Sequence, residues 1–224
     1  MADLAMPGWK DGKWEVPEWK FDGNPALIIN HMQVGIVGNG EFSGAPHEQE
    51  AKNIKESRII EYQKELLAAF RKKKLPIIFI SVIPNPIGFL PKWGFIFEVT
   101  RQKGPPGRLN NAKLAELTEV IPEMGRRPDE QLLYHTGICP FTGSHLDEVL
   151  RNHGVKDLVL CGYTAHSTLY NSVVQATNHW YSVVVPREAT GAPARDRDCA
   201  EIVLNKMMRM WALVTTTEDV IKHL

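Results

Sequence analysis

Residues 26–30 read Ala-Leu-Ile-Ile-Asn and decide the fold that we expect for this chain, because they form a short apolar run directly after Pro25. Such a run, rich in β-branched residues, is typical of a strand that is buried on both faces of a parallel sheet. Similar apolar runs follow along the chain, at residues 76–82, 131–134, 158–161, 182–185 and 212–214. The sequence therefore predicts six buried strands.

Helical patterns separate these strands. Ile59, Tyr62, Leu66 and Phe70 recur at steps of three and four residues, which predicts one long helix over residues 48–74. Further helices are predicted at residues 114–121, 144–152, 166–178, 196–210 and 217–222. Strands that alternate with helices indicate an α/β fold: three αβα layers around a six-stranded, mostly parallel sheet with Rossmann-like winding.

The chain is expected to have one folded domain, residues 25–224, preceded by an N-terminal arm, residues 1–24. The arm is rich in Trp, Pro, Gly and Lys, and its tryptophans are spaced to suit neither a helix face nor a strand face. We expect their indoles to pack on the domain or on a neighbouring subunit. The long segment 84–109 is rich in proline and glycine, which is typical of a mobile or functional loop such as a lid.

Composition narrows the class of protein. Lys plus Arg and Asp plus Glu are equal at 26 each, which argues against nucleic acid as the main partner, since a nucleic-acid surface is strongly basic. The three cysteines form no disulfide or zinc pattern. We find no signal peptide and no apolar stretch of membrane-spanning length. We expect a cytoplasmic protein with a small-molecule partner, no membrane association and no cofactor.

Three polar residues follow the predicted strands. His31 comes directly after the first strand, His135 after the third, and Thr168 lies in the first turn of the helix after the fourth. Ligands of open parallel sheets bind at the carboxyl ends of the strands, where the strand order reverses. We therefore expect these three side chains to face the same rim of the sheet.

Four segments resemble the isochorismatase-like hydrolases, also called the cysteine hydrolase superfamily. The first, residues 26–33, is similar to the family's "ALLVIDMQ". The others are similar to its "K…SAF.GT.L…L" segment, its "GVATDVCV" turn and its later strand ending in "DA", and they are residues 135–150, 162–169 and 183–190. The resemblance implies a six-stranded parallel sheet, a homo-oligomer (dimer or tetramer) and an Asp–Lys–Cys catalytic triad. Here His31, His135 and Thr168 stand at those three positions.

The resemblance implies a hydrolase of small-molecule amides, lactams or esters, with a rebuilt His/Thr site. In one version His31 is the base that activates the Thr168 hydroxyl, and His135 acts as acid or steadies the developing charge. In another, His31 activates water directly. The N–H groups of Thr168 and of Thr164 or Ala165 would form the oxyanion hole, near a cis peptide that the family keeps around residues 163–164. Histidines as working groups predict a pH profile with a limb near neutrality.

Other readings of the same residues stay open. The loss of the family's Asp, Lys and Cys also fits a non-catalytic relative that binds a metabolite or a partner. Cys139 competes as nucleophile, although a buried structural cysteine is the more common case. A metal held by His31, His135 and His166 is the weakest alternative, because the spacing carries no metal signature. Candidate pocket residues are Gln33, Trp93, Cys139, Phe141, Tyr163 and His166.

Overall fold

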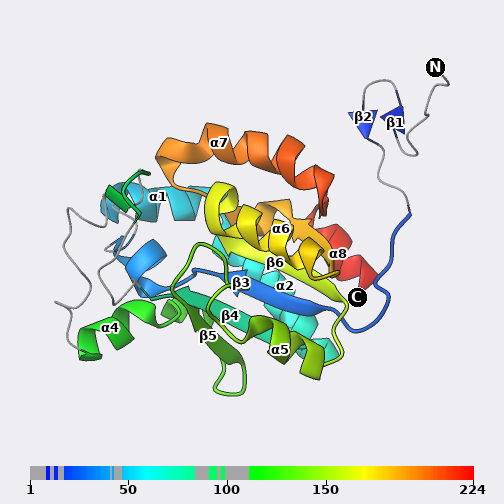
Figure 1. Ribbon diagram of the computed structural model, residues 1–224, viewed down its shortest axis with the longest axis horizontal. Helices are drawn as coiled ribbons and strands as arrows, with labels where there is room; N and C mark the ends of the chain where they lie inside the picture. Colours follow the sequence, from blue (N-terminus) through cyan, green and yellow to red (C-terminus); the bar gives the residue numbers. More distant parts are fainter. Residues whose placement is uncertain are drawn as a thin grey trace.

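A parallel β-sheet runs through the centre of the chain, between two layers of helices (Figure 1). The computed structural model describes residues 9–10, 13–14, 18–40, 42, 47–83, 91–94, 97–98 and 111–224. The sheet is formed by β3 (Ala26–Asn30), β4 (Ile77–Val82), β5 (Gln131–His135), β6 (Asp157–Tyr163), β7 (Ser182–Pro186), β8 (Thr190–Gly191) and β9 (Leu213–Thr215). The predicted α/β class and parallel sheet are confirmed.

The strand order places the turning point of the sheet between β3 and β6. The strands lie in the order β5-β4-β3-β6-β7-β9, and β8 pairs with the carboxyl end of β6, beyond the reach of β7. The first half of the sheet therefore grows outward from β3, and the second half grows the other way from β6. All of these pairings are parallel. The crevice at such a reversal is the usual ligand site of open parallel sheets.

Helices cover both faces of the sheet. One face packs against α5 (Leu146–Asn152), α6 (Tyr170–Asn178) and α7 (Arg197–Ile202), and the other packs against α1 (His47–Ser57), α2 (Ile59–Lys73) and α8 (Thr217–His223). A further helix, α4 (Asn111–Thr118), precedes β5. None of the helices in the described ranges is both long enough and apolar enough to cross a membrane.

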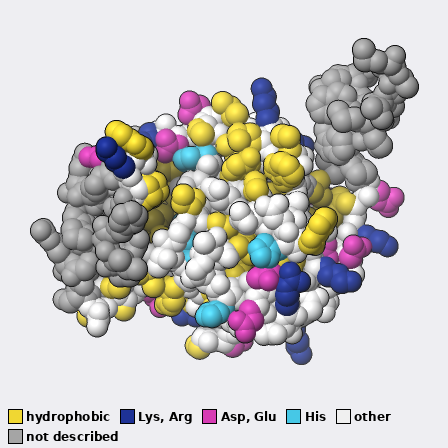
Figure 2. All heavy atoms as spheres, in the orientation of Figure 1, with side chains coloured by type: hydrophobic (Ala, Val, Ile, Leu, Met, Phe, Trp, Pro, Cys, Tyr) yellow, Lys and Arg dark blue, Asp and Glu magenta, His cyan; other side chains and the backbone are white. Residues whose placement is uncertain are grey.

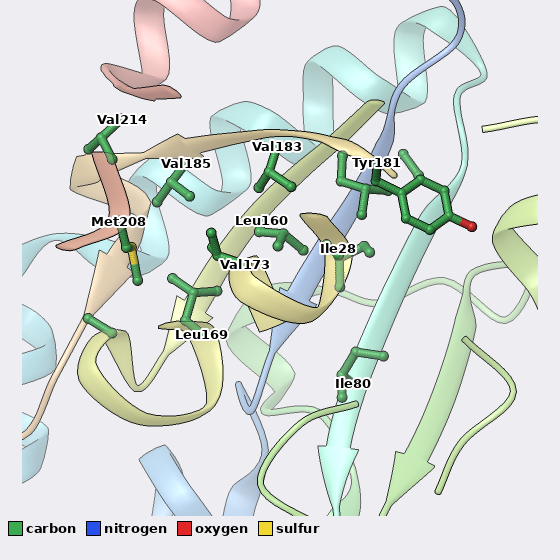
Figure 3. Packing of buried hydrophobic residues seen from close by; sticks show 14 of the residues in the cluster. Ile28, Ile80, Leu160, Leu169, Val173, Tyr181, Val183, Val185, Met208 and Val214 are labelled. Atoms are coloured by element: carbon green, nitrogen blue, oxygen red, sulfur yellow. The ribbon is translucent and has the colours of Figure 1, made fainter. Parts of the chain in front are cut away.

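Alternation along the strands divides the core into two clusters. On β3, Ala26 and Ile28 belong to the cluster beneath α6, whereas Leu27 and Ile29 belong to the cluster beneath α2. Figure 3 shows the first cluster, in which Ile28 and Leu160 of the sheet face Val173 of α6. Fully burying an aliphatic side chain of this size contributes about 1.5–3 kcal/mol, so the two clusters account for the placement of both helical layers.

The predicted helix over residues 48–74 is wrong in one respect, because the chain leaves the helical conformation at Arg58. This residue has φ 55°, in the left-handed region, and it separates α1 from α2. No glycine or proline marks the break in the sequence. The predicted helix over residues 196–210 is also not a regular α-helix along its whole length. Its α-helical part, α7, ends at Ile202, and a π-helical turn and a 3₁₀ turn follow it.

The predicted N-terminal arm and lid lie mostly outside the described residues. Within the arm, β1 (Trp9–Lys10) pairs antiparallel with β2 (Lys13–Trp14). Nearer the domain, the Trp19 indole donates a hydrogen bond to Asp219 of α8 at 3.1 Å and stacks on His223, with 4.1 Å between ring centroids. This indole therefore packs on the domain, as expected. The boundary at residues 24 and 25 stays a prediction.

Charges of both signs are mixed over the face of the molecule in Figure 2. Lysine and arginine side chains lie among aspartates and glutamates there, and no single-sign field dominates the part of that face that is not grey. This arrangement agrees with the zero formal net charge of the whole chain. It offers nothing on this face like the basic stripe that a nucleic-acid backbone needs.

Candidate active site at the carboxyl ends of the strands

Two imidazole rings meet at the carboxyl rim of the sheet. His31 follows β3, and His135 is the last residue of β5, on the far side of the intervening strand β4. Their Nε2 atoms are 2.7 Å apart, and the rings are nearly parallel, with 15° between their planes. The distance is that of a hydrogen bond in which one neutral ring donates Nε2–H and the other accepts it. The structure therefore brings together two of the three predicted rim residues.

The backbone aims His31 at its partner. Its N–H donates to the Ile80 carbonyl at 2.8 Å, which ties it to the adjacent strand, while its φ of 54° turns the chain sharply out of β3. Histidine tolerates this left-handed conformation better than most residues, but the conformation still costs about 1–3 kcal/mol. Strain of this kind persists where the surrounding structure fixes a residue, and it is concentrated at functional sites.

Burial keeps both rings neutral. His31 is 6% exposed and His135 is 1% exposed. Removal from water lowers the pKa of His31 well below its usual value, and the neighbouring ring of His135 lowers it further. Burial also lowers the pKa of His135 to about 4, partly opposed by the Gly137 backbone. The expected pH limb near neutrality is therefore wrong for these rings, because the sequence does not reveal how deeply they are buried.

The remaining ring nitrogen of His135, Nδ1, is buried and has no hydrogen-bond partner within the described chain. The Gly137 backbone is nevertheless near enough to favour the protonated ring, as a carbonyl acceptor would. A hydrogen bond from Nδ1–H to that carbonyl would be the second bond of this ring. Such a second bond fixes which nitrogen of a histidine carries the proton.

The third predicted residue, Thr168, lies on the turn between β6 and α6. A cis peptide joins Tyr163 to Thr164, as the resemblance implies, and a π-helical turn over Ala165–Leu169 follows. The Thr164 carbonyl accepts hydrogen bonds from the N–H groups of Ser167 at 3.3 Å and Leu169 at 3.1 Å. Thr168 is 6% exposed. In the described part of the chain, no hydrogen bond joins its hydroxyl to either imidazole.

Cys139 lies beside the same helix. Its thiol is 3.6 Å from the Asn171 carbonyl, and its closeness to the Ser172 hydroxyl links it to Thr168, whose carbonyl accepts from Ser172 at 2.7 Å. Burial raises the pKa of the Cys139 thiol. A thiol held in its neutral form is a poor nucleophile, which supports a structural cysteine. Asn171 and Ser172 carry no sequence signal, because only the fold reveals that this loop reaches α6.

Two predicted pocket residues, Gln33 and Trp93, are not in contact with the imidazole pair in any hydrogen bond or ring contact of the described chain. The Gln33 side chain is fully buried, donates to the carbonyls of Val82 at 3.1 Å and Leu117 at 3.2 Å, and accepts from the Val82 N–H at 2.7 Å. It therefore holds the rim end of β4 against α4. Trp93 is 78% exposed, with the Lys92 ammonium over its ring at 4.8 Å.

Phe141 and Tyr163 make their contacts with other groups than the imidazole pair. Phe141 stacks on His179 just beyond the last turn of α6, with 5.3 Å between ring centroids, whereas Thr168 precedes the first turn of this helix. Tyr163 is buried in the cluster on the α2 face, where its hydroxyl donates to the carboxylate of Glu50. Burial, followed by this hydrogen bond, raises the pKa of Tyr163. Glu50 had no sequence signal, since it lies in a long polar helix.

The third histidine of the proposed metal alternative is engaged elsewhere. His166 Nε2 lies 3.8 Å from Asp196 Oδ2. Over the described ranges, no three His, Cys, Asp or Glu side chains come together as a set that would hold a metal ion. These contacts give the three-histidine hypothesis no support.

Comparison with known proteins gives a consistent result. The sequence model of the isochorismatase domain matches residues 25–219. No curated protein matches the chain in sequence. Solved structures with the same fold include an isochorismatase family protein from Burkholderia thailandensis, with 23% identity, TM-score 0.68 and coverage of 90% of this chain and 95% of the other.

Two further structures share the fold at similar distance. A cysteine hydrolase from Pseudomonas syringae pv. phaseolicola 1448A has 20% identity and TM-score 0.70, over 93% of this chain and 98% of the other. An N-carbamoylsarcosine amidase from Thermoplasma acidophilum has 19% identity and TM-score 0.63, over 88% of this chain and 98% of the other. At these identities the likeness speaks for the fold.

Proposed function

This chain belongs to the isochorismatase family, a family of hydrolases, and we propose that it hydrolyses a small-molecule amide, lactam or ester with His31, His135 and Thr168 as its working set. The observation that carries the proposal is the 2.7 Å contact between the two imidazoles. Because both rings are buried and resist protonation, the pair is a neutral, unprotonated base at pH 7.

One arrangement of protons suits this role. If His135 donates Nδ1–H toward Gly137, its Nε2 accepts the Nε2–H of His31, and the Nδ1 of His31 is left with a lone pair. That atom takes a proton from water as the water oxygen attacks the carbonyl carbon. The tetrahedral intermediate then collapses, the C–N or C–O bond breaks, and the proton passes to the leaving nitrogen or oxygen. The products are an acid and an amine or alcohol.

Thr168 has a supporting role in this version. Its hydroxyl makes no hydrogen bond to an imidazole within the described chain, so nothing there deprotonates it for attack. Its N–H, with that of Thr164 or Ala165, is our candidate for the oxyanion hole, because these groups lie on one tight turn at the start of α6. Attack by the Thr168 hydroxyl itself remains the competing version.

The test is turnover of a panel of p-nitrophenyl esters and p-nitroanilides by His31→Asn, His135→Gln and Thr168→Ala. Asparagine tolerates the left-handed φ of residue 31, so the first variant keeps the fold. We expect a fall in kcat/KM of about 10²–10⁴-fold for His31→Asn, the usual contribution of a general base. The control is His145→Gln, because this side chain, directly before α5, is 85% exposed. Unchanged turnover in both His31→Asn and His135→Gln would refute the proposal.

The two versions of the reaction separate on Thr168→Ala. With water as nucleophile, this variant keeps measurable turnover, and intact-protein mass spectrometry finds no acyl adduct on the wild type. Complete loss of turnover in Thr168→Ala, together with an acyl adduct on the wild-type chain, would identify the hydroxyl as nucleophile.

A non-catalytic binding protein is the second candidate, favoured by one observation. The two Nε2 atoms are occupied by each other in a buried pair, which is also how structural histidines are held. A ligand that raises the melting temperature but is never turned over at any pH would support this candidate. We also expect a cytoplasmic homo-oligomer, dimer or tetramer, and light scattering of the purified chain tests the assembly.

A further inference from the structure

Asn30 is a buried polar residue that the proposed function does not use. Its side chain is fully buried, and neither its amide nitrogen nor its amide oxygen has a hydrogen-bond partner within the described chain. Every other residue of β3 is apolar. An unpartnered buried amide destabilises a fold, and asparagine is a poor strand former. Its presence here therefore needs an explanation other than stability.

The register places this amide next to the candidate site. Along β3, Ala26 and Ile28 belong to the cluster beneath α6, so Asn30 continues the same face toward the rim. On the other side of β4, Leu133 packs against this cluster and His135 continues its face in the same way. Figure 3 shows Ile28 on this face, beside Leu160 of β6 and close to Val173 of α6.

The neighbouring strand approaches Asn30 closely. Its partner on β6 is Gly162, which has φ 111° and no side chain to cover the amide. A Cβ atom there would lie 2.2 Å from the Asn30 carbonyl oxygen. Beyond Gly162 the chain enters the turn that carries Thr168. Asn30 thus lies at the end of the strand that leads to His31, paired with the strand that leads to the turn of Thr168.

We propose that Asn30 is a further binding residue of this site, and that its amide hydrogen-bonds a neutral group that both donates and accepts. Two groups in the proposed reaction have this chemistry: the amide of the substrate, and the attacking water. An asparagine side chain pairs with either through its NH₂ donor and its oxygen acceptor. This inference rests on the proposed function for the reaction but not for the binding.

The experiment compares Asn30→Leu, which keeps the branched shape of the side chain but is larger, with Asn30→Ala in case the first variant is overpacked. The matched control is Ser81→Ala, because the Ser81 hydroxyl is also buried and unpartnered but lies on the opposite face, in line with Ile77 and Phe79. We expect Asn30→Leu to raise the melting temperature by about 2–4 °C, the shift that satisfying or removing one polar group gives in a chain of this size.

The catalytic activity of Asn30→Leu should fall although its melting temperature rises. We expect Asn30→Leu to lower kcat/KM for p-nitroacetanilide about tenfold, as the loss of one hydrogen bond does, while Ser81→Ala leaves it unchanged. If the partner is the substrate amide, KM rises and p-nitrophenyl acetate, which lacks the N–H, is affected less. If the partner is water, kcat falls equally for both compounds.

A binding measurement keeps this inference separate from the proposed function. If the partner is the substrate amide, benzamide should raise the melting temperature of the wild type and of Ser81→Ala, but not that of Asn30→Leu. Loss of this shift would support the inference even if no compound is hydrolysed. A lower melting temperature in both Asn30 variants, with unchanged benzamide binding and unchanged turnover, would overturn it and leave the proposed function standing.

Discussion

Lowering the pH from 7 to 5 should destabilise this protein through its buried imidazole pair. An unfolded histidine has a pKa of about 6.5. Burial lowers the pKa of folded His135 to about 4. At a pH between these two pKa values, residue 135 binds a proton in the unfolded chain but not in the folded chain. The stabilisation is therefore complete above about pH 6.5 and is lost as the pH falls through about 4.

The size of the effect follows from the two pKa values. For His135 alone, the free energy of unfolding should fall by about 2 kcal/mol between pH 7 and pH 5, and by about 3 kcal/mol in total once the pH is below 4. His31 acts in the same direction, because burial also lowers its pKa. Carboxylates dominate acid unfolding only nearer pH 4, so the interval from 7 to 5 isolates the histidines.

Urea unfolding at both pH values, followed by tryptophan fluorescence, measures the loss directly. The informative quantity is its difference between the wild type and His135→Gln, since the variant has nothing to protonate at this position. The exposed-site variant His145→Gln should behave like the wild type. An equal loss in the wild type and in His135→Gln would refute the claim that the buried pair excludes a proton.

Three further predictions concern other parts of the molecule. The rate of hydrolysis should stay level through neutrality and fall only at a pH well below 6.5, because burial lowers the pKa of the base, His31; a limb near 6.5 in a pH–rate profile would contradict this. Arg71→Met should lower the free energy of unfolding by about 3–5 kcal/mol, because it leaves the 7% exposed Glu130 carboxylate without its ion-pair partner. Urea titrations measure this loss, and a loss under about 1 kcal/mol would be evidence against a structural ion pair. Gly162→Ala should yield little folded protein by circular dichroism, since the added Cβ would collide with the Asn30 carbonyl, and wild-type melting would show that the strands can separate.

The layers of the fold could be predicted because each buried strand is a short apolar run between helical patterns. The break at Arg58 could not, because a left-handed residue without glycine or proline leaves no local signal. The candidate site shows the same division. Strand ends place His31 and His135 on one rim, but how deeply they are buried depends on distant segments, so their pKa could not be predicted. The stacking of Phe141 on His179, just beyond α6, could not be predicted either, because only the fold brings these two residues together.

The backbone ladder between β3 and β6 has a consequence for how this site can change. Five consecutive residues of β3, Ala26 to Asn30, pair in register with five of β6. The spacing between the histidine side of the rim and the threonine side is thus set by main-chain hydrogen bonds, which no substitution of a rim side chain alters. The sheet therefore fixes the positions of the rim residues, while the side chains at those positions can vary. An ancestor could exchange one catalytic side chain at a time without relocating the others, so new chemistry in this scaffold need not require a new architecture.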